Sequence, residues 1–268
     1  MQPRSTRKRY PTQSYPDGAG HQEVALEAPL QLLLSSQSSS ETLRLGTILR
    51  TPGSDYELAL GYLHSLELVL SRRDLVQLSY CSEVQDYNTL RVVFRGPVPE
   101  RAYQLRSQEW VHGGCGACGQ DRLDTQPPRP VERLHPQHPL WSRLGQLPQL
   151  LRQHQPLFIK TGGVHAAAAL DPTGTWLEVH EDVGRHNAVD KVVGALMMVD
   201  RLPLAQHWLL LSGRAGYELV HKAVLAGFSA VASLGPPSSL AIDYAQQAGL
   251  TLVGFLGEDR YHCYTPWK

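Results

Sequence analysis

The order of apolar segments in this 268-residue chain predicts an α/β domain preceded by a smaller α+β domain. After residue 140, helix-like and strand-like segments alternate, which produces right-handed crossovers and a sheet with a parallel portion. Before residue 110, strand-like segments flank a single helix-like one. The expected division is a disordered tail over residues 1–22, a small α+β domain over 23–110, a flexible loop over 111–139 that carries a C-x-x-C pair, and an α/β domain over 140–268.

Periodicity and turn residues place the elements of the small domain. Residues 1–22 mix Arg, Lys, Pro, Ser and Gly without apolar periodicity, which is typical of disorder. The turn Thr51-Pro52-Gly53-Ser54-Asp55 ends in residues that can cap a helix. The expected elements are strands at 30–34 and 42–49, a helix at 56–69, and strands at 75–81 and 89–94.

In the α/β domain, Gly and Pro separate the elements. Asp171-Pro172-Thr173-Gly174 predicts a hairpin, and Gly227 and Gly249 suit helix ends. Since ligands of such sheets gather outside the carboxyl ends of the strands, we expect a site at residues 212–214 and 255–260. The expected elements are a helix at 141–154 with a break at Pro148, a turn at 161–163, strands at 164–170 and 175–180, a helix at 187–199, a strand at 207–211, a helix at 215–226, a strand at 229–233, a helix at 238–247 and a strand at 250–255.

The composition excludes several classes of protein. The 25 Lys and Arg residues balance the 25 Asp and Glu residues, which argues against nucleic acid as the main partner. No apolar run approaches the roughly 18 residues of a membrane-spanning helix, and the basic N-terminus lacks the apolar region of a secretory signal. Four cysteines in a chain of this length do not form a disulfide framework. We therefore expect a cytoplasmic protein whose C-x-x-C pair is chemical.

That pair lies in Gly113-Gly114-Cys115-Gly116-Ala117-Cys118-Gly119. The glycines remove side-chain bulk and permit tight turns, so a partner's reactive atom can approach either sulfur closely. Three uses of the pair stay open at this point: half of a metal site, a redox or disulfide pair, and a thiolate nucleophile that carries a group.

Zinc is not expected. A closed zinc site needs two further ligands, and the nearest candidates, His135 and His138, have spacings outside the usual ranges. The hairpin followed by alternating strands and helices also resembles the zinc deaminases, whose signature is H-x-E before P-C-x-x-C. Here His165-Ala166-Ala167 lacks the Glu, and the cysteine pair precedes the histidine.

Three polar stretches are candidate binding sites, each with a structural alternative. Residues 181–191 hold acids, bases and amides that serve either a ligand or a capped helix start. Ser212-Gly213-Arg214 precedes a helix and suits a phosphate, which an arginine can clamp, but a simple serine cap also explains it. Phe255 to Arg260 could cradle a phosphate or be a polar turn.

Several motifs in order resemble one known family. Cys115 to Gly119 is similar to its CGxCG, Thr161 to Ala168 to its TGGxHAAA, and Glu181 to Lys191 to its EDVGRHNAxDK. The segments 51–53, 57–61, 212–215 and 250–255 match as well, so the resemblance runs from about Pro29 to Thr265. On these motifs the chain is identified as a member of the formate dehydrogenase accessory sulfurtransferases, FdhD type.

The resemblance implies a cytidine deaminase-like α/β domain, a small α+β domain and a homodimer. It implies a sulfurtransferase that takes persulfide sulfur from a cysteine desulfurase. The sulfur would go to the molybdenum or tungsten bis-pterin guanine dinucleotide cofactor before the cofactor enters apo formate dehydrogenase. The family's persulfide cysteine matches Cys115, and its cofactor loop matches Phe255 to Arg260.

Residues and resemblance together give the candidate site. Glu258 and Asp259 are unusual in a loop that faces phosphates, and we expect them to point away from the phosphates. Two other functions stay open: a non-enzymatic chaperone for the cofactor, and a zinc-stabilised interaction module. The candidates are Cys115 and Cys118 as catalytic residues and, as cofactor-binding residues, His186, Lys191, Ser212, Arg214, Phe255, Leu256, Gly257, Glu258, Asp259 and Arg260, with no metal ligands, no nucleic acid and no membrane.

Overall fold

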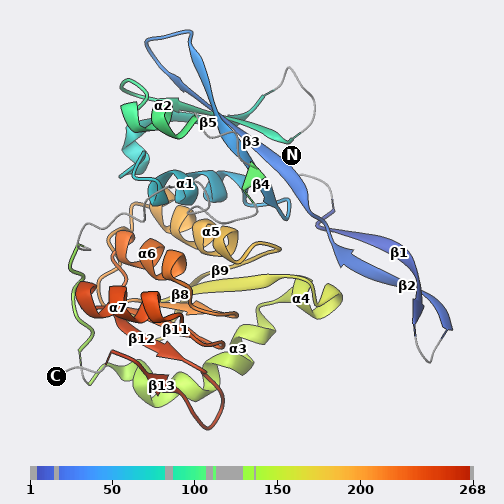
Figure 1. Ribbon diagram of the computed structural model, residues 1–268, viewed down its shortest axis with the longest axis vertical. Coiled ribbons are helices and arrows are strands. Elements are labelled where there is room, and N and C mark those ends of the chain that lie inside the picture. Colours follow the sequence, from blue (N-terminus) through green and yellow to red (C-terminus); the bar gives the residue numbers. More distant parts are fainter. Residues whose placement is uncertain are drawn as a thin grey trace.

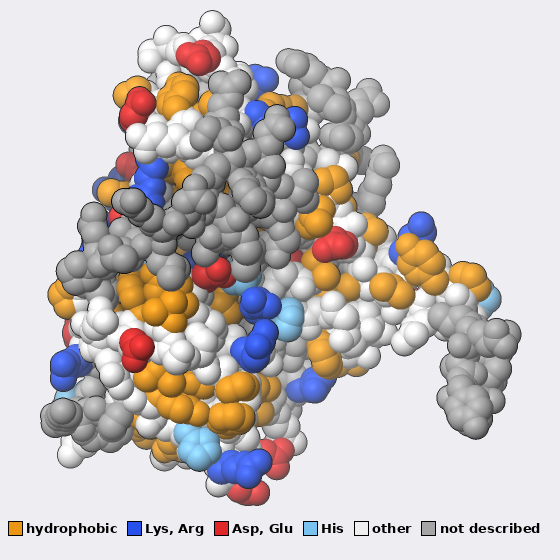
Figure 2. Space-filling view, viewed as in Figure 1, with side chains coloured by type: hydrophobic (Ala, Val, Ile, Leu, Met, Phe, Trp, Pro, Cys, Tyr) orange, Lys and Arg blue, Asp and Glu red, His pale blue; other side chains and the backbone are white. Residues whose placement is uncertain are grey.

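The chain folds into two stacked units and a projecting hairpin (Figure 1). The computed structural model describes residues 5–14, 18–81, 87–106, 111–112, 129–135 and 137–265. Lys, Arg, Asp and Glu side chains are scattered over the described surface visible in Figure 2, which agrees with the zero net charge of the chain.

The N-terminal unit is built on a five-stranded sheet in the order β5-β6-β3-β4-β7. Strand β3 alternates buried leucines with half-buried residues, as a sheet with one face against a core requires. Helix α1 supplies the other side of this core through Leu58, Leu60 and Leu63. The elements are β3 (Ala28–Ser36), β4 (Thr42–Arg50), α1 (Asp55–Ser65), the 3₁₀ helix η1 (Arg72–Asp74), β5 (Leu75–Tyr80), β6 (Thr89–Phe94), α2 (Glu100–Arg106) and β7 (Val111–His112).

The C-terminal unit contains a six-stranded sheet in the order β13-β12-β11-β10-β8-β9. Strands β10, β11 and β12 are parallel to one another, while β8 runs antiparallel to β10. The expected α/β sheet with a parallel portion is therefore confirmed. The strands are β8 (His165–Leu170), β9 (Trp176–Asp182), β10 (Trp208–Leu211), β11 (Ala230–Ser233), β12 (Thr251–Gly254) and β13 (His262–Cys263).

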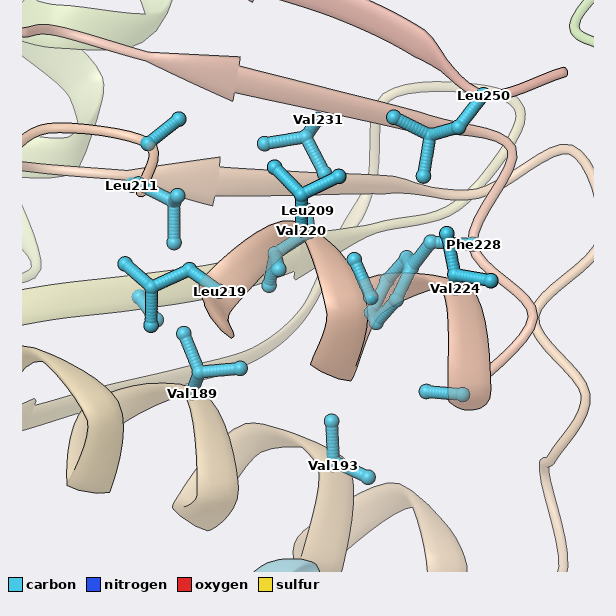
Figure 3. Close-up of a cluster of buried hydrophobic side chains, with 14 of the residues drawn as sticks. Val189, Val193, Leu209, Leu211, Leu219, Val220, Val224, Phe228, Val231 and Leu250 are labelled. Atoms are coloured by element: carbon cyan, nitrogen blue, oxygen red, sulfur yellow. The ribbon is translucent and has the colours of Figure 1, made fainter. Parts of the chain in front are cut away.

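Helices cover both faces of this sheet. On one face, α5 and α6 pack Val189, Val220 and their neighbours against Leu209 and Val231 (Figure 3). On the other face, leucines of η3 and α3 pack around Trp208. The helices of the unit are the 3₁₀ helix η3 (Pro139–Gln146), α3 (Leu147–Gln153), α4 (Pro156–Thr161), α5 (Arg185–Met198), α6 (Tyr217–Leu225) and α7 (Ser239–Ala248).

The expected disordered tail is wrong for most of its length. Strands β1 (Arg7–Ser14) and β2 (Gly18–Ala25) pair as an antiparallel hairpin. The hairpin depends on backbone hydrogen bonds and on local contacts, an ion pair between Arg7 and Glu23 and the ammonium group of Lys8 above the ring of Tyr10. A prediction based on apolar periodicity misses such a hairpin because it needs little buried apolar surface.

Two glycines let the units approach each other closely. A Cβ atom on Gly61 of α1 would lie 1.9 Å from the carbonyl oxygen of Asp190 in α5. A Cβ atom on Gly194 of α5 would lie 1.8 Å from the carbonyl oxygen of Glu57 in α1. The backbones of the two helices therefore touch, and only glycine fits at both crossing points.

We expect Gly61→Ala and Gly194→Ala to lower the free energy of unfolding by roughly 2 kcal/mol each. Alanine gains about 1 kcal/mol of helix propensity, but overpacking costs about 3 kcal/mol here, the upper end of its usual range, because the added Cβ would meet rigid backbone. Denaturant unfolding measures the loss, with Gly96→Ala as control because a Cβ there meets nothing within 4 Å. Equal stability of all three variants would contradict the close approach.

Candidate functional site

The ends of three neighbouring strands meet at one edge of the C-terminal sheet. Because β8 is antiparallel to β10, the start of β8 lies beside the residues that follow β10. The hydroxyl of Ser212 accepts a hydrogen bond from the backbone N–H of Ala166 (2.8 Å), and the N–H of Ser212 donates to the carbonyl of Ala166 (3.0 Å). His165 pairs with Asp182 at the end of β9. This is the edge at which open α/β sheets bind ligands.

Two adjoining hollows open at this edge. One has a volume of about 520 Å³ and the other of about 700 Å³, sizes typical of small-molecule sites. Both are lined by Gln149 and Glu258, so they adjoin at these two residues. The first, which we call the serine cleft, is further lined by Pro148, Arg152, Gln155, Phe158, Gly162, Gly163, Val164, His165, Ser212 and Leu234, and the second, the tryptophan cleft, by Trp141, Ser142, Gly145, Gln146, Asp259, Arg260 and Tyr261.

The loop after β12 is anchored by its backbone. The N–H of Phe255 donates to the carbonyl of Gly235 (3.2 Å), and that of Leu256 donates to the carbonyl of Ser233 (3.0 Å). Phe255 is 45% exposed, whereas the side chain of Leu256 lies in the core. The buried side chain of Leu256 therefore holds the loop in place. Cofactor binding by this residue stays a prediction. Gly145 of η3 lets the loop approach, because a Cβ there would lie 2.3 Å from the carbonyl oxygen of Glu258.

The structure brings several of the candidate residues together. Ser212 and Glu258 line the serine cleft, and Glu258, Asp259 and Arg260 line the tryptophan cleft. Arg214 is exposed just beyond Ser212 and makes no hydrogen bond or ion pair with the residues that the structure describes. Glu258 lines both hollows. The expected orientation of Glu258 and Asp259 away from the phosphates stays a prediction.

The polar stretch 181–191 has a structural role that capping alone does not describe. The buried carboxylate of Asp182 accepts hydrogen bonds from the N–H of Thr51 (3.1 Å) and the amide of Asn187 (2.9 Å), and pairs with the ammonium of Lys191 (2.7 Å). Lys191 also donates to the carbonyl of Thr51 (2.9 Å). These contacts join the start of α5 to the turn between β4 and α1.

Two further pairs occupy the buried face of α5. Nε2 of His186 lies 2.5 Å from the carboxylate of Glu218 in α6, and burial lowers the pKa of His186. Both oxygens of Asp190 accept from Lys222 at 2.5 Å, and burial raises the pKa of Asp190 to about 6. His186 is 4% exposed and Lys191 is 2% exposed, and their polar groups are engaged inside the protein. Cofactor binding by these two residues stays a prediction.

The sequence reasoning missed the wall of the serine cleft. The carboxylate of Glu181 accepts from the N–H groups of Leu157 (2.9 Å) and Phe158 (2.8 Å), the first turn of α4. This contact holds the start of α4, the short helix that ends just before Gly162 and Gly163. No local pattern signals it, because Glu181 lies 23 and 24 residues from its partners.

Cys115 and Cys118 lie outside the described residues. Among the residues that are described, no group of three or more His, Cys, Asp or Glu side chains could hold a metal ion. His138 is one of the two zinc candidates, and both of its ring nitrogens are hydrogen-bonded to backbone groups. Nε2 lies 3.1 Å from the carbonyl oxygen of Gln206, and Nδ1 accepts from the N–H of Leu140 (3.2 Å). The absence of zinc stays a prediction.

A mixed parallel and antiparallel sheet with helices on both faces, and with hollows at its carboxyl edge, places the chain in the α/β class. The model of the FdhD/NarQ family matches residues 25–268, and the chain belongs to that family. Among the described residues, no helix is long and apolar enough to cross a membrane.

Proteins named sulfur carrier protein FdhD are similar over most of the chain. The Nocardia farcinica protein is 41% identical over 90% of this chain and 86% of its own length. The Streptomyces coelicolor protein is 40% identical over 87% of this chain and 83% of its own length. A crystal structure of a Desulfotalea psychrophila protein, described as a formate dehydrogenase accessory protein, shares the fold with a TM-score of 0.71 over 98% of both chains at 20% identity.

We expect Lys191→Met to lower the free energy of unfolding by about 3–5 kcal/mol, because it leaves the buried carboxylate of Asp182 without its cation. Denaturant unfolding measures the loss. The matched control is Lys160→Met, on an exposed residue of α4, which should change stability by at most about 0.5 kcal/mol. A stable Lys191→Met variant would show that the ion pair does not hold α5 in place.

Proposed function

We propose that this protein is a sulfur carrier and sulfurtransferase. It passes persulfide sulfur from a cysteine desulfurase to a molybdenum or tungsten bis-pterin guanine dinucleotide cofactor, and this transfer is required for formate dehydrogenase activity. The observation that carries the proposal is the 41% identity to a sulfur carrier protein over 90% of the chain. The cytidine deaminase-like description of the C-terminal sheet and a homodimeric state belong to the same proposal.

Cys115 is the proposed sulfur carrier. Its thiolate attacks the outer sulfur of the persulfide on the desulfurase. The bond between the two sulfurs of the donor breaks, the donor leaves as a thiolate, and Cys115 holds the persulfide. Cys118 either assists the transfer or competes with it: its thiolate can attack the inner sulfur of the Cys115 persulfide, which forms a Cys115–Cys118 disulfide and releases the outer sulfur as hydrosulfide. The described chain before this pair ends at His112 in β7, whose backbone pairs with Ile48 of β4.

The cofactor is cargo in this proposal, and the two clefts are its proposed binding site. The two hollows adjoin at Gln149 and Glu258, so an elongated ligand could contact both of them. Arg214 and Arg260 are exposed, and no ion pair with a described residue occupies either of them. A guanidinium group without a carboxylate partner is suited to a phosphate, which it can bind through two parallel hydrogen bonds.

We expect desulfurase and cysteine to add one sulfur atom to the wild-type protein, about 32 Da by intact mass, in a form that reductant removes. Cys115→Ala should not gain the sulfur and should not activate formate dehydrogenase. Cys81→Ala is the matched control and should behave as wild type, because Cys81 lies outside the Gly-flanked pair. Labelling of Cys115→Ala together with retained activation would overturn the assignment.

We expect GDP, a stand-in for half of the cofactor, to bind more weakly to Arg214→Ala and Arg260→Ala. Each variant loses a charge-assisted contact, which should weaken binding about ten- to a hundredfold in a calorimetric titration. Arg73→Ala is the control, because Arg73 lies in η1 of the N-terminal unit, where it forms an exposed ion pair with Asp200. Equal affinity of all these variants would show that the cofactor site lies elsewhere.

A further inference from the structure

His165 is the first residue of β8 and lines the serine cleft. Its ring nitrogens have no hydrogen-bond partner among the residues that the structure describes. Other buried or half-buried histidines do have one: His64 with Val69, His138 with Gln206, His180 with Glu178, His186 with Glu218 and His207 with Ala205. A polar ring that is held at a rigid sheet edge and left without a protein partner is available to a ligand.

The position of the ring is fixed by its neighbours. The β8 backbone pairs with β9 at Asp182, and its next residue is hydrogen-bonded to Ser212. Gly213 makes room for the imidazole, since a Cβ there would lie 3.2 Å from Nδ1. The ring is therefore placed between the Gly162-Gly163 turn and the end of β10, facing the same hollow as Ser212.

The surroundings of this ring favour an anion. Arg185, at the start of α5, acts on the ring electrostatically and has no hydrogen bond or ion pair with any described residue. Burial and then the Arg185 guanidinium lower the pKa of His165, and Asp182 opposes them weakly. The lining of the cleft adds Arg152 from α3 and one acid, Glu258. Asp182 is already paired with Lys191, so cationic groups outnumber free acids here.

We propose that His165 is a ligand-contacting residue of the serine cleft, which donates a hydrogen bond to an oxygen of a bound phosphate or diphosphate group within the electrostatic influence of Arg185. The inference rests on the proposed function for the presence of such a ligand. It adds a residue and a location to it: a phosphate group of the ligand lies over the β8 and β10 ends, at His165 and Ser212.

The proposal predicts a dependence on pH. An anion next to the imidazole favours its protonated form, so the pKa of His165 rises when the ligand binds. By linkage, the affinity of the wild-type protein increases as pH falls from about 8 to 5.5, relative to a variant that cannot titrate. The charged groups that face the ring are Arg185 from α5 and Asp182 from β9, with Arg152 and Glu258 along the cleft.

The test uses the full chain with inorganic pyrophosphate and with GDP as probes in calorimetric titrations. His165→Ala should weaken both probes about tenfold at pH 7, the size expected for one hydrogen bond to a charged group. His165→Asn keeps a donor, so it should lose less affinity, but it should lose the pH dependence that distinguishes wild type. His207→Asn is the matched control, because His207 precedes β10 at the opposite edge of the sheet.

A second measurement uses the wild-type protein, so its result does not depend on whether the His165 variants fold. NMR titration of the His165 ring should show its pKa rising when pyrophosphate is added. The inference is wrong if this pKa does not move, or if both His165 variants bind GDP as wild type does while Arg214→Ala binds it weakly. In that second case the proposed function survives. Failure of wild type to bind either probe would overturn this inference and the proposed cofactor site, whereas the sulfur-carrier function is decided separately by the mass experiment on Cys115.

Discussion

The contact between α1 and α5 is the constraint on which the rest of the molecule depends. Gly61 and Gly194 bring the two backbones together, and the start of α5 is then joined to the turn after β4 by the buried carboxylate of Asp182. The N-terminal unit is in this way fixed against the edge of the sheet where the clefts open. A site composed of strand ends needs such a support, because loops alone do not hold side chains in place.

Much of the fold could be predicted from the sequence because periodicity reports burial. The helix expected at 187–199 is α5, and the alternating elements after it have the expected order. The hairpin of β1 and β2 and the short helix α4 could not be predicted in the same way. The hairpin buries little apolar surface, and α4 begins where Glu181, remote in sequence, accepts its first N–H groups.

The candidate site was predictable in location and less so in its members. Strand order alone placed Ser212 and the loop after β12 at one edge. Charge and motif suggested Lys191 as a ligand, yet its three donors face buried oxygens, which only the packed structure reveals. His165 is the opposite case. It stands among small residues in the sequence, which did not suggest a binding role, and the structure places it in the lining of the serine cleft.

The buried ion pairs of α5 determine whether the C-terminal unit can fold as a separate fragment. A fragment that began at residue 140 would lack Thr51, and so would remove one acceptor from Lys191 and one donor from Asp182. It would also expose the glycine face of α5 to water, with the ion pair of Asp190 and Lys222 at its margin. The C-terminal unit thus lacks contacts that it needs to fold alone. The two units should therefore be expressed as one chain, and they should unfold together.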